Sequence, residues 1–235
     1  MPDHIVKAYD SDITSLKTML AEMGGIAEEQ LTNAIIALSK RDTTLADQVI
    51  ARDEKLDRLE REIEEKAILT IAKRQPMALD LREIMVAIRV SSDIERIGDL
   101  AKNTAKRTHA ISEALPRRLA TGLARMGSMA QAQLKDVLDA YGLKDDDKAM
   151  KVWRADEDLD ALYNSIFREL LTYMMEDPRN ISLCTHLLFG AKNLERIGDH
   201  TTNIAENIHY LIHGKTISEG RPKKDVTAMM TADIK

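Results

Sequence analysis

The sequence predicts an all-α protein built from two tandem three-helix bundles related by internal duplication. Only 3% of the 235 residues are aromatic, whereas Ala, Leu, Ile, Met, Glu, Asp, Lys and Arg are abundant, which favours packed helices over β-sandwiches or barrels. Apolar residues recur at spacings of three and four along most of the chain, as in amphipathic helices. One acidic motif also occurs twice, so the two halves are expected to share one fold.

The first three helices follow from this periodicity. Apolar residues mark one helix over residues 13–38 and a second over residues 49–71. A third helix is expected to begin at Pro76, because proline is favoured at the first helical position, and to continue past Ile111. A break follows at Pro116, since proline disfavours helix in the residue before it.

The same cycle then repeats. One helix is expected over residues 116–141, another over about 145–175, and a last one opened by Asp177 as cap and Pro178 as first residue. After Gly214 the chain loses its periodicity and gains Gly, Pro and Lys, so we expect a flexible tail. The predicted segments are residues 1–113 for the first bundle, 114–214 for the second and 215–235 for the C-terminal tail.

The internal repeat is the strongest feature of the sequence. Residues 93–103 read DIERIGDLAKN and residues 193–203 read NLERIGDHTTN, and a second acidic echo lies upstream of each segment. In every case the two acids stand four residues apart, so they project from one face of a helix. The recurring acids are Asp53, Asp57, Glu95 and Asp99 in the first unit, and Asp156, Asp160, Glu195 and Asp199 in the second.

These eight acids are candidate metal ligands. Like charges four residues apart repel, and the repulsion grows where two such helices face each other away from water. A hard cation would compensate it, and an all-carboxylate shell suits Mg²⁺, Ca²⁺, Mn²⁺ or an iron cluster. The alternative is that the acids are solvated and form ion pairs with Arg96, Arg196 and nearby lysines. Recurrence of four pairs in register favours metal binding.

The surroundings of the acids can also be predicted. The second unit has Tyr163 where the first has Glu60, so the second acidic stripe should be partly buried. Glu195 and Asp199 are expected at the edge of the apolar seam, neither deep in the core nor fully exposed. Gly98 and Gly198 lie inside helices, where glycine is costly, and indicate close approach of a neighbouring helix or of a ligand, with packing the favoured reason.

Three further features have structural interpretations. The pair Gly24–Gly25 in the first helix admits the same packing interpretation as the other glycines. His109 and His209 share the repeat offset but are interpreted as helix-end histidines favoured by the helix dipole rather than as ligands. The lone Cys184 is expected to be a small core residue.

Composition and missing motifs exclude several classes of function. A formal net charge of −5 gives no support for nucleic-acid binding, which needs a surplus of Lys and Arg. The N-terminus lacks the pattern of a signal peptide, and charge interrupts every apolar stretch before the length of a membrane span. The chain is therefore expected in the cytoplasm, with membrane contact only through partners. It has no nucleotide-binding or catalytic motif, so it is not expected to be an enzyme.

The sequence resembles the PhoU family. The resemblance is carried by the paired ERIGD segments, by Gln75-Pro76 followed by Asp80-Leu81-Arg82, and by Met23-Gly24-Gly25, and it covers nearly the whole chain. It implies two similar three-helix bundles in tandem, with iron or zinc clusters at the E/D-x-x-x-D motifs in some members. The second unit has Asp177-Pro178-Arg179-Asn180 in place of Asp-Leu-Arg, so the two surfaces are not expected to be identical.

The resemblance also implies a function. PhoU proteins are negative regulators of phosphate uptake and of the phosphate-starvation response. They act as cytosolic adaptors between a phosphate ABC transporter, through its ATPase subunit, and a sensor histidine kinase. A homodimer is expected as well, because Ile197, Ile204 and Leu211 lie opposite Glu195 and offer an apolar surface to a second bundle or a second chain.

Two alternatives remain. A helical scaffold without metal would share the same fold and differ only in metal content. A carboxylate-bridged di-metal oxidase would need two Glu-x-x-His motifs and two further Glu in one four-helix core. Only Glu206 with His209 fits that pattern, and the counterpart in the first unit is Lys106, so the oxidase is disfavoured.

Overall fold

The computed structural model describes residues 2–111 and 116–218, with side chains from residue 9 onward. These residues form six α-helices and two short 3-10 turns, and no strand occurs among them. The predicted boundary between residues 113 and 114 and most of the predicted tail, residues 219–235, lie outside the described part. The helices are α1 (Pro2–Lys40), α2 (Thr43–Arg74), α3 (Leu79–Arg107), α4 (Arg117–Leu143), α5 (Asp146–Glu176) and α6 (Ile181–His213), with turns at Thr108–Ala110 and Pro178–Asn180.

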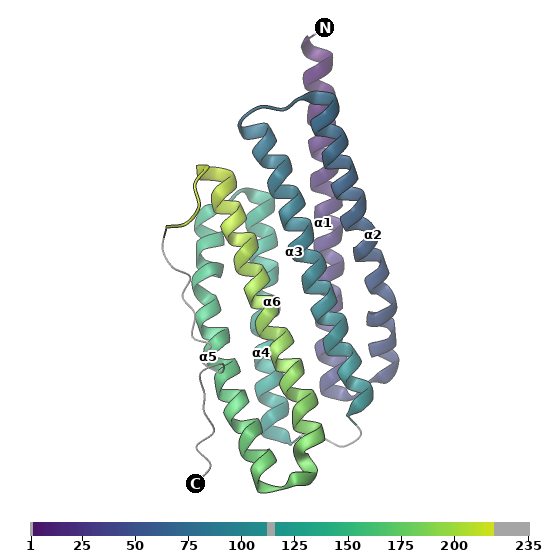
Figure 1. Cartoon of the computed structure of the whole chain (residues 1–235), viewed down its shortest axis with the longest axis vertical. Coiled ribbons are helices and arrows are strands. Elements are labelled where there is room, and N and C mark those ends of the chain that lie inside the picture. Colours follow the sequence, from purple (N-terminus) through teal and green to yellow (C-terminus); the bar gives the residue numbers. More distant parts are fainter. Residues whose placement is uncertain (1, 112–115, 219–235) are drawn as a thin grey trace.

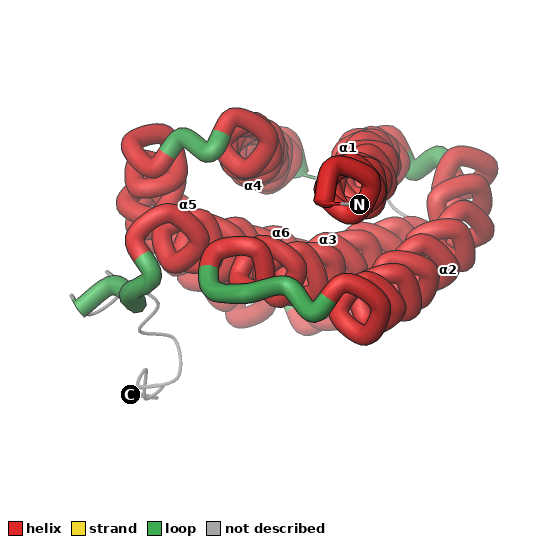
Figure 2. Tube along the Cα trace, turned by 90° about the horizontal axis from the view of Figure 1, so that it is seen from above, coloured by secondary structure: helices red, strands yellow, loops and turns green. Residues whose placement is uncertain are grey.

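The helices form two antiparallel three-helix bundles that pack side by side (Figure 1). Helices α1, α2 and α3 make the first bundle, and α4, α5 and α6 make the second. Viewed along the helices, α3 and α6 lie next to each other, α1 faces α4, and α2 and α5 occupy the two outer flanks (Figure 2). The predicted fold class is therefore confirmed.

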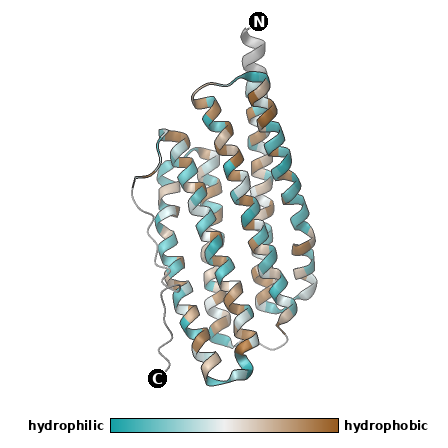
Figure 3. Cartoon of the chain, in the orientation of Figure 1, coloured by the Kyte–Doolittle hydropathy of each residue, from teal (hydrophilic) through white to brown (hydrophobic). Residues whose placement is uncertain are grey.

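Apolar and hydrophilic residues alternate along every helix, as the sequence periodicity predicts (Figure 3). The apolar stripes form one continuous core that crosses both bundles. Cys184 belongs to this core, as expected. Ile197, Ile204 and Leu211 are also buried in the core of the single chain, so they offer no surface to a second chain. Among the described residues, no helix combines the length and the apolar character needed to cross a membrane.

Matching helix caps stand at the connection between the first and second helices of each bundle. Arg41 and Lys144 both adopt the left-handed conformation, with φ of 57° and 53°. The next residue in each case is an aspartate that caps a helix: Asp42 accepts a hydrogen bond from the backbone N–H of Leu45, and Asp145 accepts one from Lys148, both at 2.9 Å. Such caps satisfy N–H groups that the first helical turn leaves free. The duplication therefore extends to the turns.

The start of the third helix differs from prediction in the first bundle, whereas in the second bundle Asp177 and Pro178 act as predicted but open a 3-10 turn that precedes the helix. Gln75 and Ala78 have positive φ values of 49° and 50°, which interrupt the helix, so Pro76 lies in a loop and α3 begins at Leu79. In the second bundle Asp177 accepts a hydrogen bond from the backbone of Arg179 at 3.0 Å, and Pro178 opens a 3-10 turn. That turn runs directly into α6. At its other end α3 stops at Arg107, before Ile111, and passes into a 3-10 turn.

Two glycines hold α1 against α4 in a reciprocal arrangement. A Cβ on Gly24 would lie 2.9 Å from Leu138 Cδ1 of α4, and a Cβ on Gly127 would lie 2.8 Å from Ile35 Cδ1 of α1. Each glycine thus receives a branched side chain from the opposite bundle, so close packing accounts for both. The packing interpretation is confirmed for Gly24, whereas Gly25 has nothing within 4 Å of its Cβ position.

Candidate functional site

The first acidic cluster lies between α2 and α3 and comprises Asp53, Asp57, Glu95 and Asp99. The ammonium group of Lys102 donates hydrogen bonds to Asp53 and, at 2.6 Å, to Asp99, so one lysine joins the two helices. Asp53 is buried, while the other three acids are partly exposed. The structure therefore brings the four predicted acids of the first bundle into one neighbourhood and supplies a cation of its own.

The charges of this cluster act on each other. Burial raises the pKa of Glu95 to about 6, with further increases from Asp99, Glu60 and Asp57, and Arg96 opposes them. Burial also raises the pKa of Asp53, although Lys102 partly offsets that increase. A carboxylate with a raised pKa is one whose negative charge is poorly compensated, so the cluster still has capacity for added positive charge.

The second acidic cluster lies between α5 and α6 and comprises Asp156, Asp160, Glu195 and Asp199. Its cation is Lys192, whose Nζ lies 2.9 Å from Glu195 Oε2. Burial raises the pKa of Glu195 to about 7, Asp199 and Asp160 raise it further, and Lys192 lowers it. The prediction of an edge position is wrong for Glu195, because only 2% of the residue is exposed, and is confirmed for Asp199, which is partly buried. The packing of α5 against α6 covers Glu195.

The inner glycines bring the backbone of the third helix close to each cluster. A Cβ on Gly98 would overlap Leu56 Cδ1, and a Cβ on Gly198 would lie 2.5 Å from Asp156 Oδ1 and 2.6 Å from Leu159 Cδ2. Helix packing therefore explains Gly98, as favoured from the sequence. At Gly198 a cluster carboxylate itself occupies the space, so the glycine also shapes the site.

Two glutamines belong to these sites and were missed from the sequence. Gln30 Oε1 lies 3.0 Å from the Cβ position of Gly98, and Gln133 Oε1 lies 3.2 Å from that of Gly198. Both residues are buried, and neither oxygen has a hydrogen-bond partner within the described part of the chain. Gln30 and Gln133 have the same separation as Asp53 and Asp156, and this offset was the signal that could have revealed them.

The donor chemistry fits a hard cation. Each cluster offers four carboxylates and a buried amide oxygen, which are the ligands that Mg²⁺, Mn²⁺, Ca²⁺ and iron accept. Among the residues that the structure describes, however, no three of the eight acids bring donor atoms within 4.8 Å of each other. Lys102 pairs with Asp53 and Asp99 instead, and Lys192 pairs with Glu195. A metal ion would therefore have to displace these ammonium groups and draw the carboxylates inward.

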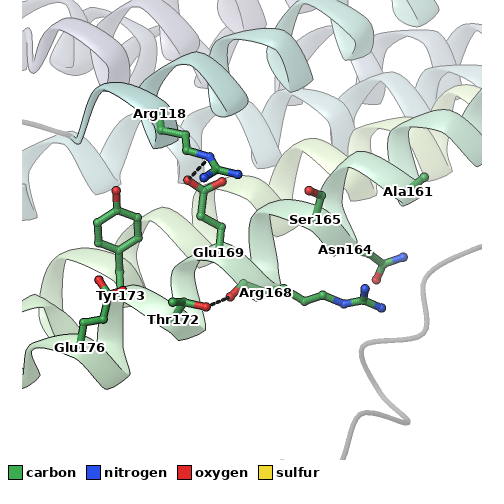
Figure 4. Close-up of a pocket in the computed structure, with 9 residues that line it drawn as sticks. All are labelled: Arg118, Ala161, Asn164, Ser165, Arg168, Glu169, Thr172, Tyr173 and Glu176. Carbon is green, nitrogen blue, oxygen red and sulfur yellow. Dashed lines mark hydrogen bonds and ion pairs between the residues drawn. The ribbon is translucent and has the colours of Figure 1, made fainter.

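A polar hollow of about 660 Å³ lies between α4 and α5 and is separate from the acids (Figure 4). Arg118 Nε lies 3.1 Å from Glu169 Oε1 on its wall, and Arg168 and Tyr173 line it as well. None of the eight predicted ligands lines this hollow. Its arginine charge is partly neutralised by Glu169, so we assign it no role in the candidate site.

The fold and the clusters define a duplicated helical-bundle protein with one carboxylate-rich site in each bundle. A family model described as the PhoU domain matches the chain twice, over residues 20–108 and 123–208. Each match contains all four acids of one cluster. The chain therefore belongs to the PhoU family.

Known relatives agree over nearly their whole length. The chain is 54% identical, over 97% of its own length and 96% of the relative, to the phosphate-specific transport system accessory protein PhoU homolog of Rhizobium meliloti (strain 1021). The homolog of the same name from Caulobacter vibrioides (strain NA1000 / CB15N) is 53% identical over 96% of this chain and 99% of the relative. These names describe an accessory protein and not an enzyme, in agreement with the prediction.

Solved structures show the same fold. The crystal structure of PhoU from Pseudomonas aeruginosa superposes with a TM-score of 0.85 at 38% identity, covering 88% of this chain and all of that one. The phosphate transport system regulatory protein PhoU from Streptococcus pneumoniae gives a TM-score of 0.83 at 27% identity, covering 90% of this chain and all of that one. The two-bundle arrangement is thus common to these proteins.

Proposed function

We propose that this protein is a negative regulator of phosphate uptake and of the phosphate-starvation response. In this proposal it acts in the cytoplasm as an adaptor between the ATPase subunit of a phosphate ABC transporter and a sensor histidine kinase. The observation that carries the proposal is its full-length similarity to relatives named as accessory proteins of the phosphate-specific transport system. An accessory protein of a transporter needs surfaces for partners more than it needs a catalytic centre.

The two ends of the molecule support an adaptor role. The turn between α2 and α3 and the turn between α5 and α6 lie at opposite ends of the long axis (Figure 1). Each end exposes large apolar side chains, which are typical of interaction surfaces where they cluster. Exposed apolar residues at or beside these turns are Met77 and Leu79 at the first end, and Met175 and Ile181 at the second.

A pull-down from phosphate-replete and phosphate-starved cells tests the adaptor. We expect the transporter ATPase and the kinase to co-purify with the wild-type chain under replete conditions. The variant Met77→Asp, which places a charge on an 80% exposed side chain, should lose one partner and keep the other. An exposed charge reversal on the flank of α2, Glu62→Lys, serves as the matched control. Recovery of neither partner with the wild type would contradict the proposal.

We propose further that the two acidic clusters bind metal, with iron or zinc expected from the family and Mg²⁺, Mn²⁺ or Ca²⁺ compatible with the ligands. The support is the four-acid set in each bundle, the raised pKa of Glu95 and Glu195, and the unpaired amide oxygens of Gln30 and Gln133. Elemental analysis of protein purified without chelator tests this. Replacing Glu195 and Asp199 by Ala should remove the metal of the second bundle while helical content stays unchanged.

A matched control is the pair Glu62→Ala and Glu65→Ala, which removes two exposed acids from α2 and leaves the clusters intact. Unchanged metal stoichiometry after loss of Glu195 and Asp199 would refute the assignment.

The metal-free scaffold is the second candidate, and a specific observation favours it. Lys102 and Lys192 already neutralise part of each cluster, so the fold can form without a metal ion. Metal-free purified protein that still recovers both partners would select this candidate.

A homodimer is also proposed, and light scattering at several protein concentrations would test it. The oxidase stays disfavoured. Trp153 donates a hydrogen bond at 2.9 Å to Glu206, the one Glu-x-x-His carboxylate that an oxidase could use.

A further inference from the structure

We propose that Asp146, His209 and His213 form a binding site for one divalent transition-metal ion, with zinc the best match, at the end of the second bundle. This site is separate from the two acidic clusters and does not depend on the proposed function. Asp146 lies in the first turn of α5, and the two histidines lie in the last turns of α6. Local spacing marks His209 only as a helix-end residue, because Asp146 is 63 positions away in the chain.

The three side chains converge on one point. His209 Nδ1 lies 2.9 Å from Asp146 Oδ1, and His213 Nε2 lies 2.9 Å from Asp146 Oδ2. The two imidazole rings stand one helical turn apart, with centroids 4.5 Å from each other. Within the described residues this is the one group of His, Cys, Asp or Glu whose three donor atoms all lie within 4.8 Å.

The spacing is close to that of a zinc shell. Zinc binds His nitrogen and carboxylate oxygen at about 2.0–2.2 Å in a tetrahedron, which places neighbouring donor atoms about 3.3 Å apart. The two contacts of 2.9 Å, one to each oxygen of Asp146, would open by a few tenths of an ångström, and one donor atom from each of the three residues already lies within 4.8 Å of the others. The two ring nitrogens that now face the carboxylate would hold the metal through their lone pairs, with the ring protons on the opposite nitrogens.

The ligand set selects the class of metal. Two imidazoles and one carboxylate suit Zn²⁺ and similar transition metals better than Mg²⁺ or Ca²⁺, which prefer oxygen ligands alone. His213 is 47% exposed, and both histidines border a cleft of about 490 Å³, so solvent can supply the remaining ligand. The acidic clusters offer no imidazole, so a zinc ion bound there would have oxygen ligands alone.

The charges around the site have both signs. Burial opposes ionisation of Asp146, but hydrogen bonds from His213 and His209 outweigh it and hold the pKa of Asp146 below its ordinary value. The C-terminal end of α6 adds partial negative charge beside His213. Arg154 and Lys215 line the same cleft and weaken the attraction for a cation.

The first bundle provides a natural control. His109 occupies the position of His209 in the repeat, and its Nε2 lies 2.9 Å from Asp47 Oδ1. That pair is well exposed and has no third ligand among the described residues. A single histidine with one carboxylate binds metal weakly, so His109 should not contribute. Along α6, His209 lies about 20 Å from Glu195, given a rise of about 1.5 Å per residue.

Zinc titration of the full-length protein, with X-ray absorption of the one-equivalent complex, tests the proposal. We expect imidazole scattering from two histidines in the wild type. His213→Gln should lower the affinity of the imidazole-bound ion by about tenfold or more, comparable to the losses seen when a metal shell is disturbed. His109→Gln should leave affinity and spectrum unchanged. Circular dichroism checks that the half-exposed His213→Gln substitution leaves the helices intact.

His209→Gln and Asp146→Asn provide independent arms and should each weaken binding. The proposal is overturned if bound zinc shows only oxygen scattering, or if His213→Gln and Asp146→Asn both bind as tightly as the wild type. Zinc bound to oxygen alone would place the ion in an acidic cluster. That result would overturn the histidine site and support metal binding by the acidic clusters, so the two proposals can fail independently. Loss of binding in His109→Gln to the same extent as in His213→Gln would also overturn it.

Discussion

The two acidic clusters have matching acids but are neutralised from different positions. In the first bundle Lys102 follows Asp99 by three residues on α3, whereas in the second bundle Lys192 precedes Glu195 by three residues on α6. The position equivalent to Lys102 holds Thr202, and the position equivalent to Lys192 holds Ser92. Duplication has therefore preserved the place of each carboxylate while the compensating charge has moved. This is the pattern expected if the acids, more than their ion pairs, are what the protein needs.

The clusters also differ in their contact with water. Tyr163 covers the second cluster, and Lys192 Nζ lies 4.9 Å from the centroid of its ring. The first cluster has Glu60 at that position, which is only partly buried and adds negative charge. The drier site accordingly has the higher pKa, about 7 for Glu195 against about 6 for Glu95. The predicted burial of the second stripe is confirmed.

Alanine at the inner glycines should give the largest effect. Gly198→Ala is expected to destabilise the protein by about 3 kcal/mol, because the new methyl group would overlap Asp156 and Leu159 in a packed core. Gly98→Ala should cost less, about 2 kcal/mol, since it meets mainly the flexible end of Leu56. Chemical denaturation measures both. Gly25→Ala is the control and should stabilise by about 0.5–1 kcal/mol, because its Cβ position is open. Equal losses of stability for Gly98→Ala and Gly198→Ala would show that the two glycines are packed equally tightly, contrary to this prediction.

Loss of the resident lysines should come next. Lys102→Met leaves Asp53 and Asp99 without their shared partner, and we expect about 2 kcal/mol of destabilisation after allowance for partial exposure. Lys192→Met should cost about 1 kcal/mol, since Glu195 can take up a proton near neutral pH. Denaturation in the presence of a chelator measures both values. If Lys192→Met destabilised the protein more than Lys102→Met, the expected order of the two lysines would be wrong.

Stability should depend on pH through Glu195. Its pKa rises from 4.5 to about 7 on folding, so the folded chain holds this proton more tightly than the unfolded chain does. The contribution is favourable below pH 4.5 and is lost as the pH rises through about 7. Glu195→Gln should therefore raise the free energy of unfolding at pH 8 by about 2 kcal/mol in chelator, and by little at pH 4. Glu95→Gln should show a smaller difference. A gain that is independent of pH would exclude ionisation as the cause.

The matched caps should give the smallest and most equal effects. Asp42→Ala and Asp145→Ala each remove one 2.9 Å hydrogen bond to a helical N–H. Each should cost about 1 kcal/mol of stability. Thermal or chemical denaturation compares them directly. A difference well above about 1 kcal/mol would show that the two turns are not equivalent, in contrast to their backbone geometry.

Much of the site was predictable because helical spacing is a local property. Acids four residues apart must share a face, so the pairs Glu95 with Asp99 and Glu195 with Asp199 follow from the sequence alone. The helix that faces each of these pairs could be inferred as well, because Asp53 with Asp57 and Asp156 with Asp160 form a second repeated pair of acids. Burial of Glu195 could not be predicted, because its exposure depends on how closely α5 approaches α6. Gln30 and Gln133 were missed because a glutamine in a helix carries no periodic signal of its own.

By itself the sequence determined the fold class, the duplication and the faces on which the acids lie, because each of these follows from local spacing or from self-similarity. The tertiary structure alone decided that Lys102 reaches Asp53 on the facing helix, that Ile197, Ile204 and Leu211 are used inside the chain, and that Asp146 meets His209 and His213. Those results depend on contacts between residues that are far apart in sequence. The physical reason is that spacing fixes the direction of a side chain, whereas only packing fixes what it meets.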